Sequence, residues 1–190
     1  EAVPVGEGAM IAVLGLKIDE VNNFIKNRVE KEGICEIAND NAEGQVIISG
    51  SKKTLEDLQA SFKEKKIKSI PLKVSAPFHC SLMRKAADNM RGKIDNVKFS
   101  EPLIEIVNNV TANKEKNPEI IKKLLVEQIY STVKWRESIL YLSKKGVKNF
   151  IEIGPGKVLT GMIKRTIKES NCFSLNSIAD IKNFIDEFKK

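Results

Sequence analysis

QVIISGSKKTLEDLQASF, residues 45–62, carries a clear strand-then-helix pattern from which the fold of this chain can be inferred. Its first part, residues 45–50, is a short apolar run that is typical of a β-strand. The residues that follow place Leu55, Leu58 and Phe62 at the spacing of one helix face. A strand that leads directly into an amphipathic helix predicts a fold in which the helix packs its apolar face against a sheet.

Strands and helices continue to alternate on both sides of this stretch. A strand is expected at residues 9–16, a helix at 18–32, a strand at 34–38 and a strand at 68–74. The polar residues 39–44 (NDNAEG) predict a turn. The resulting order, β-α-β-β-α-β, predicts a ferredoxin-like fold with helices across one face of a small antiparallel sheet.

The rhythm changes at Ser75, after which helices alternate with short, continuous apolar strands. Strands are expected at residues 103–110, 149–153 and 172–175, and helices at 82–97, 118–130, 136–145, 157–169 and 177–190. This alternation predicts an α/β fold with a doubly wound parallel sheet.

We therefore expect two subdomains, a ferredoxin-like small subdomain at residues 5–74 and a larger α/β subdomain at residues 75–190. Three strands are few for a parallel sheet, which usually has ~5 or more. The larger subdomain is expected to be incomplete. We expect the chain on its own to expose a strand edge and apolar surface, and to be poorly stable. The chain begins with Glu1 rather than Met, so we expect a fragment, a processed product or a trimmed chain.

The composition argues against several classes of protein. No run reaches the ~18 consecutive apolar residues of a membrane span, and we expect a cytoplasmic protein that does not bind membranes. Cys35, Cys80 and Cys172 are odd in number and lack zinc-site spacing, so reduced thiols are expected. The net charge of +7 is spread over helix faces where lysines alternate with acidic residues. Charge alone therefore does not indicate nucleic-acid binding.

The chain has a single histidine, His79, in the segment VSAPFHC (74–80). A lone histidine is more often structural than catalytic. However, His79 lies in a proline-containing turn where the two expected subdomains meet, and ligand clefts concentrate at such junctions. His79 is therefore the candidate general base.

A histidine base needs a nucleophile, and the nearest one is Cys80. Adjacent residues in an extended backbone point to opposite sides, so a hydrogen bond between His79 and Cys80 is not expected. A Cys80-dependent enzyme stays an alternative hypothesis. None of the eleven glycines begins a G-x-S-x-G elbow. A serine nucleophile would therefore have to lie outside this chain.

Three other features allow more than one interpretation. The turn Gly154-Pro155-Gly156 could present backbone N–H groups to an anion at a helix N-terminus, or could only pack a strand closely against a helix. Asn39 and Asn41 are expected in a loop, where local turn hydrogen bonds are the simplest role. Gln128 lies on a mostly apolar helix, where it needs a hydrogen-bond partner if buried.

Several stretches carry a resemblance to one known family. They are EAVPVGEGAM, NDNAEGQVIISG, IPLKVSAPFHCSLM, IVNNV, VEQIYSTVKWRESI and IEIGPGKVLTGMIKR. In order and spacing the chain resembles the C-terminal portion of malonyl-CoA:acyl-carrier-protein transacylases. The resemblance implies an α/β-hydrolase-like large subdomain, incomplete here, with an inserted ferredoxin-like small subdomain. It also implies that an upstream segment supplies the remaining strands, the serine in its elbow, an oxyanion-hole glutamine and a malonyl-binding arginine.

The resemblance assigns roles to four residues. His79 matches the catalytic base, and Gln128 matches the residue whose backbone carbonyl orients the imidazole in place of a carboxylate. Phe78 resembles the residue that narrows the acyl pocket, and Asn41 resembles a loop asparagine near the thioester arm of the substrate. Neither a metal nor a cofactor is implied.

The implied function is transfer of a malonyl group from malonyl-CoA to the phosphopantetheine thiol of acyl carrier protein in fatty acid biosynthesis, by a Ser/His ping-pong mechanism. Malonyl-CoA and acyl carrier protein are the expected partners, with no nucleic acid and a monomer when complete. The alternative from another class is a non-catalytic fragment or binding module with a ferredoxin-like domain and a basic surface.

Overall fold

The computed structural model describes residues 3–4, 6–28 and 33–188. The chain forms two compact units, an N-terminal unit of residues 1–138 and a C-terminal unit of residues 139–190. This division does not coincide with the subdomain boundary expected after residue 74, which stays a prediction. Among the described residues, no helix is both long and apolar enough to cross a membrane.

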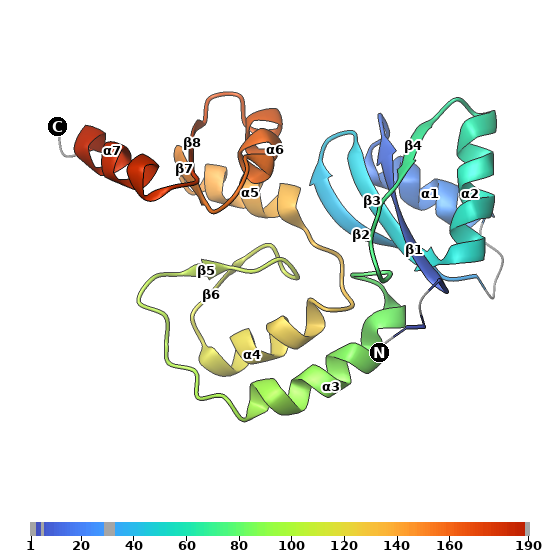
Figure 1. Cartoon of the computed structure of the whole chain (residues 1–190), viewed down its shortest axis with the longest axis horizontal. Helices are drawn as coiled ribbons and strands as arrows, with labels where there is room; N and C mark the ends of the chain where they lie inside the picture. The colour runs from blue at the N-terminus through green and yellow to red at the C-terminus, as the bar shows by residue number, and fades with distance from the viewer. Residues whose placement is uncertain (1–2, 5, 29–32, 189–190) are drawn as a thin grey trace. The chain divides into compact units, whose positions relative to one another are not determined.

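The N-terminal unit contains a four-stranded antiparallel sheet with the strand order β2-β3-β1-β4 (Figure 1). Its elements follow one another as β1 (Gly8–Leu14), α1 (Ile18–Arg28), β2 (Cys35–Ala42), β3 (Gln45–Ser51), α2 (Lys52–Glu64) and β4 (Lys68–Pro71). The β-α-β-β-α-β order expected from the sequence is confirmed. The expected last turn of the first helix, at residues 29–32, lies outside the described residues.

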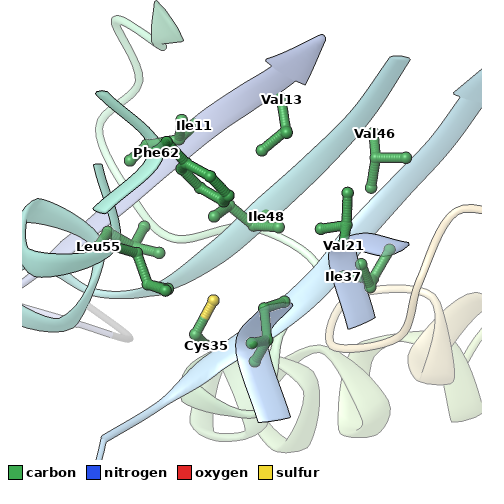
Figure 2. Close-up of a cluster of buried hydrophobic side chains, with 11 residues drawn as sticks. Ile11, Val13, Val21, Cys35, Ile37, Val46, Ile48, Leu55 and Phe62 are labelled. Atoms are coloured by element: carbon green, nitrogen blue, oxygen red, sulfur yellow. The ribbon is translucent and has the colours of Figure 1, made fainter. Parts of the chain in front are cut away.

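The sheet separates two apolar clusters, because successive side chains of a strand point to opposite faces. Both helices pack on one face, where Val21 of α1 and Leu55 and Phe62 of α2 are fully buried against β1, β2 and β3 (Figure 2). Phe62 also stacks on Phe24, with ring centroids 4.5 Å apart. The opposite face carries a smaller cluster of Met10, Ala12, Ala38 and Ile47, with Leu72 packed against it.

The turn expected at residues 39–44 is wrong in extent, because β2 continues to Ala42 and only residues 43–44 form the turn to β3. Asn39 pairs with Ile47 and Asp40 pairs with Val46, with register shifts on either side of these pairs. The outer edge of β2 is also paired, since Asn39 forms a parallel bridge with Val133. A partner from far along the chain therefore holds a polar segment in the sheet.

Asp40 is fully buried in this strand and forms an ion pair with Arg136. The guanidinium Nε lies 3.0 Å from both carboxylate oxygens, and Nη2 lies 2.8 Å from Oδ2. This hydrogen bond to Asp40 raises the pKa of Arg136 above its usual range. The buried carboxylate is thus matched by a fork of donors, as burial of a charge requires.

The rest of the N-terminal unit follows β4. Its elements are the short 3-10 helix η1 (Ser81–Met83), α3 (Arg84–Asp95), β5 (Ile106–Val107), β6 (Lys114–Glu115) and α4 (Pro118–Glu127), with α5 (Trp135–Lys144) crossing the boundary between the units. Asn117 caps α4, since its side chain accepts hydrogen bonds from the N–H groups of Glu119 and Ile120. Helices α3 and α4 pack side by side (Figure 1).

The buried strand expected at residues 103–110 is wrong in extent and burial. Only Ile106 and Val107 are in a strand, which pairs antiparallel with β6. Leu103 and Ile104 are 98% and 78% exposed. Within the described residues no strand pairs with the segment before Ile106, so no sheet covers Leu103 and Ile104.

The C-terminal unit contains β7 (Asn149–Ile153), α6 (Val158–Thr166), β8 (Asn171–Leu175) and α7 (Ile178–Phe188). Strands β7 and β8 pair in parallel, as the expected βα rhythm requires. The expected burial of residues 149–153 is wrong in part, because Phe150 is buried but Ile153 is 74% exposed. The expected exposure of apolar surface is confirmed here and at Leu103, while poor stability of the chain stays a prediction.

Replacing Arg136 with alanine should lower the free energy of unfolding by about 3–5 kcal/mol, because it leaves the buried Asp40 carboxylate unpaired. The double variant Asp40→Leu, Arg136→Met should recover most of this loss, since no buried charge remains. Urea denaturation followed by circular dichroism measures both. Lys17→Ala is the control, because it removes an exposed ion pair to Glu43 and should cost no more than about 1 kcal/mol. Equal losses of unfolding free energy in Arg136→Ala and Lys17→Ala would contradict the prediction.

The three thiols should differ sharply in reactivity. Burial raises the pKa of Cys35 to about 12 and also raises the pKa of Cys80, so neither is a thiolate at pH 8. Cys172 is only partly buried. A chromogenic disulfide reagent at pH 8 should label Cys172 first, and the other two only after urea is added. Rapid labelling of Cys80 in the folded chain, located by mass spectrometry, would contradict this and would favour a Cys80-dependent enzyme.

Candidate functional site

The segment that carries His79 follows β4 and is anchored at Pro77, which is fully buried. Pro77 packs directly against the backbone of Gly8 at the start of β1. A Cβ atom at position 8 would lie 2.3 Å from Pro77 Cγ, far inside van der Waals contact. The absence of a side chain at Gly8 therefore allows the segment to lie close to the sheet.

His79 has a left-handed backbone with φ of 60°. A residue with a Cβ pays about 1–3 kcal/mol for such a conformation, and it persists only where surrounding contacts hold it. One such contact is the His79 N–H, which donates to the Ile129 carbonyl at 3.3 Å. Non-glycine residues in strained conformations concentrate at functional sites, which supports a functional role for His79.

The imidazole of His79 is partly exposed and donates one hydrogen bond to the backbone of Gln128. Nδ1 lies 2.8 Å from the Gln128 carbonyl oxygen. A carbonyl can only accept, so Nδ1 carries the proton and Nε2 of the neutral ring keeps its lone pair. In the part of the chain that the structure describes, Nε2 has no hydrogen-bond partner. The ring can therefore accept a proton at Nε2.

Gln128 is suited to this role because it follows the last residue of α4. The final carbonyl groups of a helix have no partner inside the helix and carry partial negative charge. The Gln128 N–H donates to Leu124 O at 2.9 Å, which keeps the residue in the helical path. Its side-chain oxygen accepts from Asn109 Nδ2 at 3.2 Å. The Gln128 carbonyl is thus held in place and can stabilise a protonated imidazole.

Cys80 does not pair with His79. Its thiol is fully buried and donates to Pro77 O at 3.1 Å, and burial raises its pKa. The expectation that the two side chains would not hydrogen-bond agrees with these contacts. The extended backbone on which that expectation rested is wrong, because the backbone at His79 is left-handed.

The other two candidate residues, Phe78 and Asn41, lie in different elements of the structure. Phe78 is 38% exposed and directly precedes His79 in the same loop. Asn41 lies in β2 and not in a loop, which corrects its expected position. No hydrogen bond among the described residues joins Asn41 to His79 or Gln128. The structure thus brings His79 and Gln128 together and leaves Asn41 without a shown role.

Sequence reasoning missed a second set of contacts around the histidine. Both the N–H and the hydroxyl of Ser81 donate to the carboxylate of Glu36 in β2, with the N–H at 3.1 Å from Oε2. Glu36 and Ser81 are 45 positions apart, so no local pattern joins them. The one signal was a glutamate inside the apolar run ICEIA (34–38), which needs a partner if partly buried.

The turn at Gly154-Pro155-Gly156 does not offer free N–H groups to an anion. The Glu152 carboxylate accepts from the N–H groups of Leu159 at 3.1 Å and Thr160 at 2.7 Å, at the start of α6. The hydrogen bond from the Thr160 N–H lowers the pKa of Glu152. The Gly156 N–H donates to Asn176 Oδ1 at 2.6 Å. These contacts occupy N–H groups of the turn and do not support the anion-binding interpretation. A Cβ atom at Gly154 or Gly156 would meet none of the described heavy atoms within 4 Å, so close packing of strand against helix does not explain these glycines either. Both have positive φ, at 133° and 94°, which glycine adopts readily.

The chain as a whole is similar to solved structures of malonyltransferases. The chain superposes on an acyl carrier protein S-malonyltransferase from Vibrio cholerae with a TM-score of 0.91 and 37% identity, covering 97% of this chain and 60% of that one. A malonyltransferase from Bartonella henselae gives a TM-score of 0.93 at 37% identity, covering 100% and 60%. A third structure, a malonyl-transacylase in complex with its type II polyketide acyl carrier protein, gives 0.92 at 35% identity, covering 98% and 60%.

Sequence comparison agrees with these structures. The Malonyl CoA-acyl carrier protein transacylase of Haemophilus influenzae is 38% identical over 189 residues, which cover 99% of this chain and 60% of that protein. The Staphylococcus aureus enzyme of the same name is 38% identical over 185 residues, covering 97% and 60%. The chain thus spans about 60% of the length of the curated relatives it matches.

The family model described as "Acyl transferase domain" matches residues 3–189. That range includes both partners of the hydrogen bond between His79 and Gln128. The chain therefore belongs to the acyl transferase domain family.

Proposed function

We propose that this chain is the part of a malonyl-CoA:acyl-carrier-protein transacylase that carries the general base, His79. The observation that carries the proposal is the hydrogen bond from His79 Nδ1 to the Gln128 carbonyl at 2.8 Å. It fixes the tautomer that leaves Nε2 able to accept a proton. The relatives named as malonyl transacylases, at 38% identity, support the reaction class.

In the proposed mechanism His79 acts as base and then as acid. Nε2 takes the proton of a serine hydroxyl while the serine oxygen attacks the thioester carbonyl of malonyl-CoA. The imidazolium then returns the proton to the departing CoA thiolate, leaving a malonyl-serine ester. In the second half, Nε2 takes the proton of the phosphopantetheine thiol as its sulfur attacks the ester. The proton finally returns to the serine oxygen.

The Gln128 carbonyl has two parts in this proposal. It orients the ring toward the nucleophile, and its partial negative charge stabilises the imidazolium that forms in each half-reaction. A carbonyl is a weaker partner than a carboxylate because it carries no full charge. The imidazolium is therefore stabilised less, which keeps it ready to give up its proton.

The serine is proposed to come from a polypeptide segment outside this chain, because no G-x-S-x-G elbow occurs within it. The matched relatives are longer than this chain, which leaves room for such a segment. An arginine there would pair with the malonyl carboxylate through two parallel hydrogen bonds, and so select malonyl over acetyl. The exposed side chains of Leu103 and Ile104 are apolar surface that an additional segment could cover.

The remaining roles also follow the resemblance. We propose that Phe78 narrows the acyl pocket, which its partial exposure beside His79 supports. Asn41 is proposed to lie near the thioester arm of the substrate. Acyl carrier protein is the proposed partner, as in the complex of the related malonyl-transacylase. The complete enzyme is proposed to need no cofactor and to act as a monomer in the cytoplasm.

Malonyl transfer should require His79 and not Cys80. The chain is joined to the segment of the Haemophilus influenzae relative that the match leaves uncovered, and transfer of radiolabelled malonyl from malonyl-CoA to acyl carrier protein is measured. His79→Ala should lower kcat by about 10³-fold or more, because the serine loses its proton acceptor. Cys80→Ser is the control and should leave kcat within about twofold. Transfer by His79→Ala at the parent rate would refute the assigned base.

Phe78→Ala should relax acyl selectivity in the same fusion protein. A wider pocket should raise kcat/KM for methylmalonyl-CoA relative to malonyl-CoA by about tenfold or more, since one methyl group in an apolar pocket is worth this much. Phe99→Ala is the matched control, because Phe99 lies beyond α3 and contacts Lys122 instead. An unchanged ratio in Phe78→Ala would show that another residue limits the pocket.

A further inference from the structure

We infer that Glu36 is a positioning residue for His79, and that it acts through Ser81. This inference rests on the proposed function, in which His79 is the general base. Glu36 lies in β2, and its two carboxylate oxygens accept hydrogen bonds from the N–H and the hydroxyl of Ser81. Ser81 is the first residue of η1 and follows His79 by two positions. The contact therefore fixes the chain immediately after the histidine.

The loop needs such a contact because His79 is in the left-handed region, with φ of 60°. Besides the packing of Pro77 and the ring hydrogen bond to Gln128, two further hydrogen bonds hold it, and both are weak. The His79 N–H is 3.3 Å from the Ile129 carbonyl, at the long end for a hydrogen bond. The Cys80 thiol is a poor donor. Glu36 is the charged acceptor in this set, and hydrogen bonds to a charged group are roughly twice as strong as neutral ones.

Strand β2 also holds the segment that follows Gln128, the acceptor of the His79 hydrogen bond. The Thr132 hydroxyl donates to Ile37 O at 2.6 Å, and the Val133 N–H donates to Ala38 O at 2.8 Å. The Asp40 N–H in turn donates to Val133 O at 3.0 Å. This segment begins four residues after Gln128. One strand thus anchors both the donor loop and the acceptor segment.

The arrangement predicts what happens when the Glu36 carboxylate is removed. The acceptor segment stays on β2 through its hydrogen bonds, while the histidine loop loses its two hydrogen bonds to a charged acceptor. The backbone of His79 can then leave the left-handed region, and Nδ1 moves away from the Gln128 carbonyl. Nε2 would then carry the proton in a growing share of molecules, and those molecules lack a free acceptor for a hydroxyl proton.

The single histidine makes this measurable without any assay of activity. Long-range ¹H–¹⁵N correlation spectra of the ¹⁵N-labelled 190-residue chain, recorded at a pH where the ring is neutral, report which ring nitrogen is protonated. The wild-type chain should show mainly the Nδ1-protonated tautomer. Glu36→Gln should lose this tautomer as the majority form. Ser81→Ala should shift the same balance in the same direction, and the double variant should add little.

Glu43→Gln is the matched control, since it makes the same chemical change at the end of the same hairpin, where Glu43 contacts Lys17 and not Ser81. Circular dichroism checks that each variant is folded, and Ser81→Ala replaces Glu36→Gln if the latter unfolds. If the folded Glu36→Gln variant keeps the wild-type tautomer, the inference is overturned. If Glu36→Gln unfolds, the same result in Ser81→Ala overturns it.

A second readout separates the inference from the proposed function. In the transfer assay with the fusion protein, Glu36→Gln should lower kcat by up to about 10²-fold at nearly constant KM, as a misplaced catalytic group does. If the tautomer shifts but His79→Ala retains full transfer, the positioning role stands and the proposed base fails. If His79→Ala abolishes transfer and Glu36→Gln changes neither tautomer nor kcat, only the positioning role fails.

Discussion

The pairing of Val133 with the outer edge of β2 is the interaction on which the N-terminal unit depends. The Val133 N–H donates to the Ala38 carbonyl, and the Val133 carbonyl accepts from the Asp40 N–H. Three residues after Val133, Arg136 forms an ion pair with the Asp40 carboxylate. An edge strand exposes unpaired backbone groups, and this pairing covers them. It also ties the chain that follows α4 to the sheet, a few residues after the Gln128 carbonyl that accepts from His79.

Much of the small sheet could be predicted because its signals are local. The spacing of Leu55, Leu58 and Phe62 defines one helix face within a single stretch, and all three are buried on the sheet. The end of β2 could not be predicted, because Asn39 and Asp40 resemble turn residues. The partner of Asp40, Arg136, lies 96 positions away and leaves no local trace. Burial was overestimated at residues 103–110 for a related reason, since an apolar run does not reveal whether anything covers it.

The residues of the candidate site were likewise predictable only in part. His79 could be singled out because it is the one histidine and follows a proline near the end of a strand. The partnership with Gln128 came from the resemblance and not from any pattern, since 49 positions separate the two residues. Neither a sequence pattern nor the resemblance predicted the contact between Glu36 and Ser81. Hydrogen bonds between distant segments depend on the fold as a whole, so the supporting contacts of a site are harder to predict than its central side chain.

The left-handed backbone at position 79 affects how substitutions there should be interpreted. Glycine and asparagine adopt this region more readily than alanine, although Ala112 of this chain has a φ of 52°, and β-branched residues adopt it least readily. A side-chain replacement at this position therefore combines two changes, the loss of an imidazole and a new conformational preference. Asparagine removes the ring while keeping the local path of the chain, so a set of variants that includes it can separate chemistry from conformation.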